Sequence, residues 1–196
     1  MPRLDYTNAN VIPMGYHLVH RFCRVNNLEA PEVRRVPREC WLFGACAYYR
    51  PEDGIVIQLE SCAQLATETW VRNWNWPGSV TDREPMGVMA HELGHHCDFL
   101  TGYKKHSYSS DYSASVREAS REKPISSYCP NDAEWFAEMF RLFVTNHALL
   151  KLLRPKTHSL LCKNFEPVTH DDWSYPLGPN VPQRILENLA RKVAKR

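Results

Sequence analysis

Long apolar runs are missing from this 196-residue chain. No stretch of about 18 apolar residues occurs, so we expect no segment that spans a bilayer. Residues 1–30 also lack a charged start followed by an apolar run and a small-residue cleavage site, which excludes a recognisable secretory signal. These features predict a cytoplasmic protein with no membrane partner.

The chain also has no large excess of charge and no regular cysteine framework. It carries 24 Lys and Arg against 22 Asp and Glu, a formal net charge of +2, so nothing requires a nucleic-acid partner. The cysteines are odd in number and include no C-x-x-C pair, which favours free thiols in a reducing compartment. They are Cys23, Cys40, Cys46, Cys62, Cys97, Cys129 and Cys162.

Internal repeats, low-complexity tracts and breaks in composition are not found either. With 43% hydrophobic residues, the chain can bury a sizeable core. The sequence therefore predicts one domain over residues 1–196, with its central motifs in 85–146, and nothing in it specifies an oligomeric state.

The most informative segment is His91-Glu92-Leu93-Gly94-His95, an H-E-x-x-H pattern. On an α-helix, residues four apart share a face, so His91 and His95 can reach one metal ion while Glu92 faces the water on it. Gly94 removes a side chain next to the metal. Pro85 suits a helix start and Thr101-Gly102 a stop.

A histidine-rich buried helix could contain this pattern by chance. The presence of a third metal-ligating residue would distinguish a metal site from such a helix. A catalytic zinc takes three protein ligands and leaves one position open. Position 101 is Thr, not the third His of a metzincin, which favours a glutamate.

The best candidates for that glutamate lie in residues 131–142, where Glu134 and Glu138 stand one turn apart beside an aromatic-rich helical stripe. The alternative is purely structural. Glu138 would pair with Arg141 on a solvated flank, and Glu134 would simply favour the helix N-terminus.

The chain resembles the gluzincin peptidases related to the anthrax toxin lethal factor and to phage-borne metallopeptidases. The resemblance covers about residues 89–165, and its blocks occur in the family's order. They are His91-Glu92-Leu93-Gly94-His95 followed by Asp98, Ser127-Tyr128, residues 131–142, and Arg154-Pro155-Lys156-Thr157. One departure is that the segment from Tyr128 to Glu134 is one residue shorter than in the lethal factor pattern.

The resemblance implies a zincin-like α+β fold with a small mixed sheet, an active-site helix and a glutamate helix. It implies that His91, His95 and Glu134 bind one Zn²⁺, that Glu92 is the general base, and that Tyr128 faces the substrate carbonyl. A buried loop tyrosine is the alternative for Tyr128.

The expected activity is that of a zinc-dependent endopeptidase acting on protein or peptide substrates. Two alternatives remain from the sequence: a metal-binding structural or interaction protein, such as a phage virion component, and a zinc amidase acting on a cell-wall peptide.

Other polar residues near the motifs have weaker assignments. A ligating His usually donates its second N–H to a carboxylate, and Glu138 and Asp98 are the candidates. Asp98 could equally be an exposed residue at the helix end. His96 points about 100° away from His95 and is interpreted as a non-ligand. Cys97 and Cys129 are more simply free thiols than extra ligands.

Elsewhere the patterns predict helices at 15–25, 62–74 and 113–122, an amphipathic helix at 183–196, and strands at 41–49 and 54–59. The strands join at the turn Pro51-Glu52-Asp53-Gly54. The resemblance implies that the second strand is the edge strand along which an extended substrate pairs.

Overall fold

The computed structural model describes residues 8–36, 47–58, 85–104, 111–125 and 131–168. In this part the chain is a mixed α+β protein, with several helices and a small three-stranded mixed sheet, as expected at that level. The expected helices at 62–74 and 183–196 lie outside the described residues.

The sheet contains β1 (Val33–Val36), β2 (Ala47–Arg50) and β3 (Gly54–Gln58) in the order β1-β3-β2. Strand β3 pairs in parallel with β1 and antiparallel with β2. The expectation that this strand is an edge strand is therefore wrong, because both of its sides are occupied. Within the described sheet β1 and β2 are the edges.

The turn between β2 and β3 behaves as its sequence predicts. The Asp53 backbone N–H donates to the Arg50 carbonyl at 3.1 Å, and Gly54 adopts a φ of +73°. A Cβ atom at Gly54 would also lie 2.3 Å from the Glu32 carbonyl oxygen. Glycine is thus required here for its backbone conformation and for space.

The helices are α1 (Asn8–Val25), α3 (Pro85–Lys104), α4 (Asp111–Ser120), α5 (Asp132–Leu153) and α6 (Pro155–Leu161). Three bounds differ from expectation. Helix α1 begins seven residues earlier than position 15, α4 is shifted by two residues from 113–122, and α3 continues through Thr101 and Gly102. Gly102 is buried, so packing outweighs its low helix propensity. Helix α6 was not predicted.

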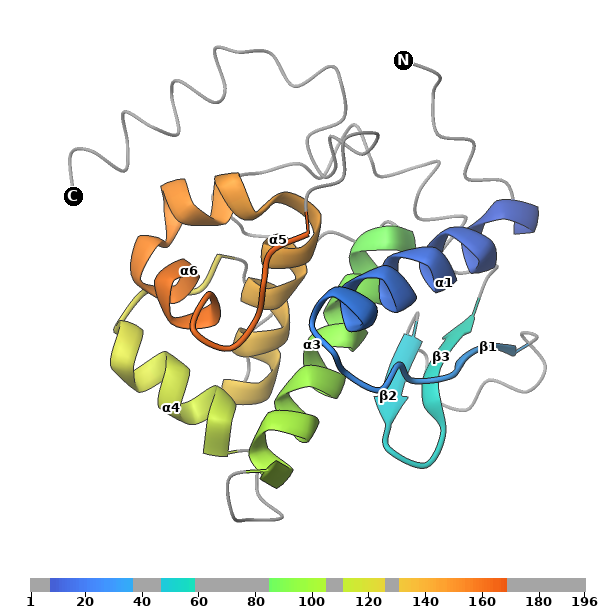
Figure 1. Cartoon of the computed structure of the whole chain (residues 1–196), viewed down its shortest axis with the longest axis horizontal. Helices are drawn as coiled ribbons and strands as arrows, with labels where there is room; N and C mark the ends of the chain where they lie inside the picture. Colours follow the sequence, from blue (N-terminus) through green and yellow to red (C-terminus); the bar gives the residue numbers. More distant parts are fainter. Residues whose placement is uncertain (1–7, 37–46, 59–84, 105–110, 126–130, 169–196) are drawn as a thin grey trace, which may run out of the picture.

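Helix α3 lies at the centre of the described structure, between the sheet and the helices α4, α5 and α6 (Figure 1). Its most extensive helix partner is α5, and α1, β2 and β3 also contact it. The packing of α3 against α5 brings the two predicted motif segments together, although they are far apart in the sequence.

An aromatic cluster holds these helices in place. Phe22 of α1 meets Phe140 of α5 edge-on, with ring centroids 5.3 Å apart, and Phe165 contacts the same ring at 5.3 Å. Such pairs add about 0.5–1.5 kcal/mol beyond the area they bury. The core-facing stripe predicted on the glutamate helix is confirmed, because Trp135, Phe136, Met139, Phe140, Phe143 and Val144 are fully buried.

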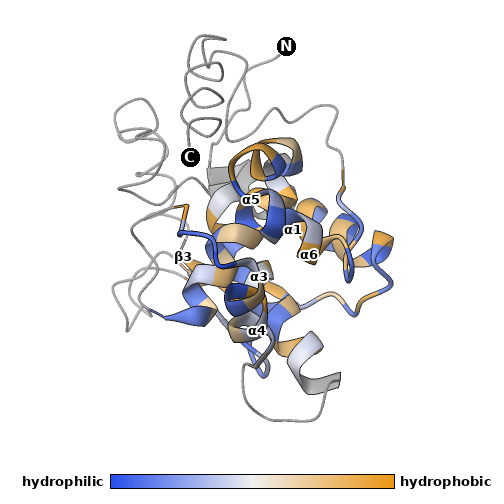
Figure 2. Cartoon of the chain, turned by 90° about the vertical axis from the view of Figure 1, so that its left-hand side faces the viewer, coloured by the Kyte–Doolittle hydropathy of each residue, from blue (hydrophilic) through white to orange (hydrophobic). Residues whose placement is uncertain are grey.

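Hydrophobic and hydrophilic residues are interspersed along the helices (Figure 2), as expected where each helix buries one side. None of the described helices combines the length and the apolar character that a membrane span needs. Among the described residues, Cys23, Cys97 and Cys162 are free thiols.

Candidate metal centre

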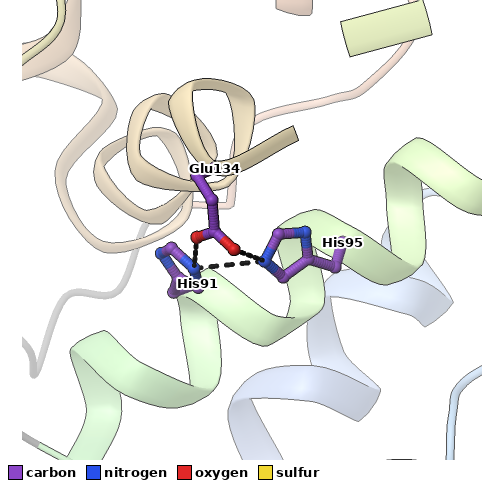
Figure 3. Close-up of side chains that lie close together, drawn as sticks. All are labelled: His91, His95 and Glu134. Atoms are coloured by element: carbon purple, nitrogen blue, oxygen red, sulfur yellow. Dashed lines mark hydrogen bonds and ion pairs between the residues drawn. The ribbon is translucent and has the colours of Figure 1, made fainter. Parts of the chain in front are cut away.

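Helix α3 presents His91 and His95 on one face, and both side chains point toward Glu134 of α5 (Figure 3). The Nε2 atoms of the two imidazoles lie 3.2 Å apart. His91 Nε2 is 3.0 Å from Glu134 Oε2, and His95 Nε2 is 3.6 Å from Glu134 Oε1. Three groups that the sequence placed on two separate segments therefore converge at one point.

Glu134 is held at this point by the start of α5. The Asn131 side chain caps the helix and accepts a hydrogen bond from the Glu134 backbone N–H at 2.9 Å. A glutamate at this third helical position commonly turns back to the cap residue in a capping box. Here its carboxylate faces the two histidines instead, so its role is not merely to start the helix.

The geometry fits a metal ion. Two ligand atoms bound at about 2.0–2.1 Å in a tetrahedral arrangement are about 3.3 Å apart. The separations of 3.0, 3.2 and 3.6 Å bracket that value. His91, His95 and Glu134 thus form a group that could hold a metal ion, and it is the only such group within the described residues.

The close contacts in this group shift the pKa of His91 and of Glu134. Burial alone would lower the pKa of His91, but hydrogen bonds to Glu134 and Glu138 outweigh burial and raise it to about 10. Burial would likewise raise the pKa of Glu134, but hydrogen bonds from His91 and His95 hold it at about 2. Without a metal ion, His91 is therefore protonated on both ring nitrogens, and it donates from Nε2 to Glu134 and from Nδ1 to Glu138. A metal ion must displace the Nε2 proton.

Glu138 lies behind His91 and contacts its second nitrogen. His91 Nδ1 is 2.9 Å from Glu138 Oε1, the contact expected of a carboxylate that fixes the tautomer of a metal-binding histidine. Glu138 also accepts from Arg141 Nε and Nη2, both at 3.3 Å. The Glu138–Arg141 pair that the structural alternative predicted is present, but both side chains are buried and not on a solvated flank.

Glu92 follows the first histidine and is 7% exposed. Burial raises the pKa of its carboxyl, while the nearby His91 and His95 and the backbone N–H of Tyr49 act in the opposite direction. Glu92 is not part of the group that could hold a metal ion, so it is a neighbour of the candidate ligands and not one of them.

The remaining candidates on α3 have partners elsewhere. Asp98 is buried and accepts a hydrogen bond from the Ser113 backbone N–H at 2.9 Å, which makes it a cap for α4 and not an exposed residue. His96 binds the Tyr49 hydroxyl and the Glu29 carbonyl, away from the ligand group. Cys97 is fully buried and burial raises its pKa, as expected of a free core thiol.

Tyr128, the proposed oxyanion partner, and Cys129 lie outside the described residues. Their assignments remain predictions.

Sequence reasoning missed several residues of this site. The signal for the Asn131 cap was present in its three-residue spacing to Glu134. For Tyr49, which approaches Glu92 from β2, no local signal existed because the contact depends on how the sheet packs on α3.

Gly94 also has a packing role that the sequence did not predict. A Cβ atom there would lie 2.9 Å from the Ala137 Cα and 3.1 Å from the Phe140 Cβ. The space is thus filled by α5 itself, and the missing side chain allows α3 and α5, which carry the candidate ligands, to approach closely.

In comparisons with known proteins, no family model, no curated protein and no solved structure matches the chain. The functional inference therefore depends on the geometry of the site.

Proposed function

We propose that this protein is a zinc-dependent endopeptidase with a zincin-like fold. The observation that carries the proposal is the convergence of His91, His95 and Glu134, whose nearest nitrogen and oxygen atoms lie 3.0 to 3.6 Å apart, with Glu92 buried beside them. Two imidazoles and one carboxylate are a typical donor set for a catalytic zinc ion, which leaves a fourth position for water or substrate.

Glu92 is the general base in this proposal. A bound zinc ion would supply a Lewis acid and lower the pKa of a coordinated water to about 7. Glu92 then takes a proton from the attacking water and passes it to the nitrogen of the leaving amine. Glu138 keeps the Nδ1 proton of His91 in place, so that Nε2 is the nitrogen available to the metal.

Strand β2 is the better candidate for the substrate-binding edge. It lies at the edge of the described sheet, and its Tyr49 backbone N–H reaches the Glu92 carboxylate. An extended peptide added beside β2 would therefore lie close to the proposed base. A peptide can use this edge through its main chain, whereas a small non-peptide amide cannot, and this favours the proposal of a peptide substrate.

A pair of measurements tests the proposal. The first is zinc content by elemental analysis in the parent protein and in the His95→Ala and Glu134→Ala variants. We expect about one zinc ion per parent chain, and loss of a ligand should remove most of it. Undiminished zinc affinity in Glu134→Ala would exclude it as the third ligand.

The second measurement compares cleavage of a peptide library by the parent and by Glu92→Gln. This variant should keep its zinc but lose about 10²- to 10⁴-fold in rate, because only the proton transfer is removed. Glu118→Gln, on an exposed position of α4, is the matched control and should cleave normally. If zinc-loaded parent protein cleaves nothing, the site is a structural one or takes another substrate.

A further inference from the structure

His96 is adjacent to the candidate ligand His95 but points to a different side of α3, toward β2. It is 5% exposed, and both of its ring nitrogens have partners. Nε2 lies 2.8 Å from the Glu29 carbonyl oxygen, and Nδ1 lies 3.0 Å from the Tyr49 hydroxyl. Since a carbonyl only accepts, Nε2 carries the proton in the neutral ring; Nδ1 then accepts, and Tyr49 donates.

Tyr49 of β2 faces this helix. Its ring meets His96 nearly edge-on, with centroids 5.2 Å apart, and Phe99 at 6.5 Å. The neighbours on β2 interact elsewhere: the Tyr48 hydroxyl donates to Asp53 at 3.3 Å, and the Arg50 guanidinium lies 5.3 Å from the Tyr48 ring. This alternation is that of a strand whose successive side chains point to opposite faces.

The backbone of Tyr49 contacts the same helix one turn earlier. Its N–H donates to the carboxylate of Glu92, which is four residues before His96 and therefore on the same face of α3. One strand residue thus contacts two successive turns of the helix, through its main chain at Glu92 and through its phenol at His96. His91 and His95 lie on the same two turns of α3 but face α5 instead.

We propose that Tyr49 and His96 are positioning residues that hold β2 against α3 and thereby orient the proposed general base, Glu92. The catalytic consequence depends on the proposed peptidase function. The claim that these residues hold β2 against α3 does not depend on that function, because it is based on the hydrogen bonds alone. A general base must hold its carboxylate in one orientation toward the water. A fixed hydrogen-bond donor to that carboxylate limits the other orientations it can adopt.

The test is Tyr49→Phe, which removes the phenolic donor and keeps the ring. We expect kcat on a peptide substrate to fall about 10- to 100-fold, with KM and zinc content nearly unchanged. Amide hydrogen exchange in β2 should become faster. Tyr48→Phe is the matched control, since this neighbour points to the other face of the strand.

A spectroscopic readout tests the pair independently of activity. Long-range ¹H–¹⁵N spectra of the parent should show His96 as the Nε2–H tautomer, with Nδ1 accepting a hydrogen bond. In Tyr49→Phe the tautomer should persist while the Nδ1 resonance moves to the position of a free acceptor. His96→Gln, which can both donate and accept, should retain more activity than His96→Ala.

Two results would overturn the inference. One is an Nδ1–H tautomer or an imidazolium at His96 in the parent, which would reverse the donor assignment. The other is a Tyr49→Phe variant with unchanged β2 exchange and unchanged kcat. If the parent cleaves no peptide, the proposed function fails, and the exchange and ¹⁵N data still decide whether the pair holds β2 on α3.

Discussion

Replacement of Gly94 by alanine should weaken metal binding at a modest cost to the stability of the fold. The new Cβ would lie 2.9 Å from the Ala137 Cα and 3.1 Å from the Phe140 Cβ. Carbon atoms in good contact are about 3.5–4.0 Å apart, so α3 and α5 must separate by roughly half an ångström or more. Overpacking of this kind costs about 1–3 kcal/mol.

The gain in helix propensity offsets part of that cost. Alanine is better than glycine in a helix interior by about 0.8–1.0 kcal/mol, so the net loss of unfolding free energy should be about 0–2 kcal/mol. The metal site has less tolerance, because ligand distances must hold to about ±0.2 Å. Glu134 moves with α5 while His91 and His95 stay on α3. We therefore expect the Kd for zinc to rise at least about tenfold, or about 1.4 kcal/mol.

The assay is a competition titration of zinc against a chromophoric chelator, together with thermal unfolding followed by circular dichroism. Leu153→Ala is the control for general destabilisation, because this buried residue lies about 28 Å along α5 from Glu134. It should cost about 2–5 kcal/mol of stability and leave zinc affinity in the folded protein unchanged. An unchanged Kd in a folded Gly94→Ala variant would refute the reasoning.

Two further predictions concern the groups around His91. Glu138→Gln should weaken zinc binding by about 10- to 100-fold and reduce stability, because it removes the charge that His91 and Arg141 share. Adding Arg141→Met to the Glu138→Gln variant should restore stability but not zinc affinity. Recovery of both would contradict the role of Glu138 in positioning His91. The metal-free protein should lose stability as pH rises from about 6.5, the ordinary pKa of histidine, toward the His91 pKa of about 10. A raised pKa stabilises the fold fully below the unfolded value, so thermal scans across this range should show the decline, and His91→Gln should flatten it.

The local parts of the site could be predicted from the sequence. The spacing of His91 and His95 defines one face of a helix wherever that helix packs, and a glycine at position 54 suits the turn that precedes β3. Glu134 was a candidate because its segment carries a long apolar stripe. Its contact with His91 spans 43 residues, however, and only the packing of α3 on α5 brings the two together.

The errors arose where the outcome depended on which element covers a given surface. The resemblance implies an edge position for β3, and no recognisable strand pattern indicates its parallel partner β1, which is only four residues long with two arginines at its centre. Its pairing with β3 moves the edge to β2. In the same way, the sequence placed Gly94 near the metal but could not show that the backbone of α5 fills the space above it.

The charges of the site can accommodate a divalent ion. In the metal-free protein, protonated His91 and Arg141 balance the carboxylates of Glu134 and Glu138. A divalent cation that displaces the His91 proton leaves one positive charge in excess. Glu92 is the buried carboxyl beside the ligands that can cancel it. Burial raises its pKa in the metal-free protein, whereas a dication would favour its ionised form. A bound dication would therefore favour the ionised form of the proposed general base, which is the form that can accept a proton.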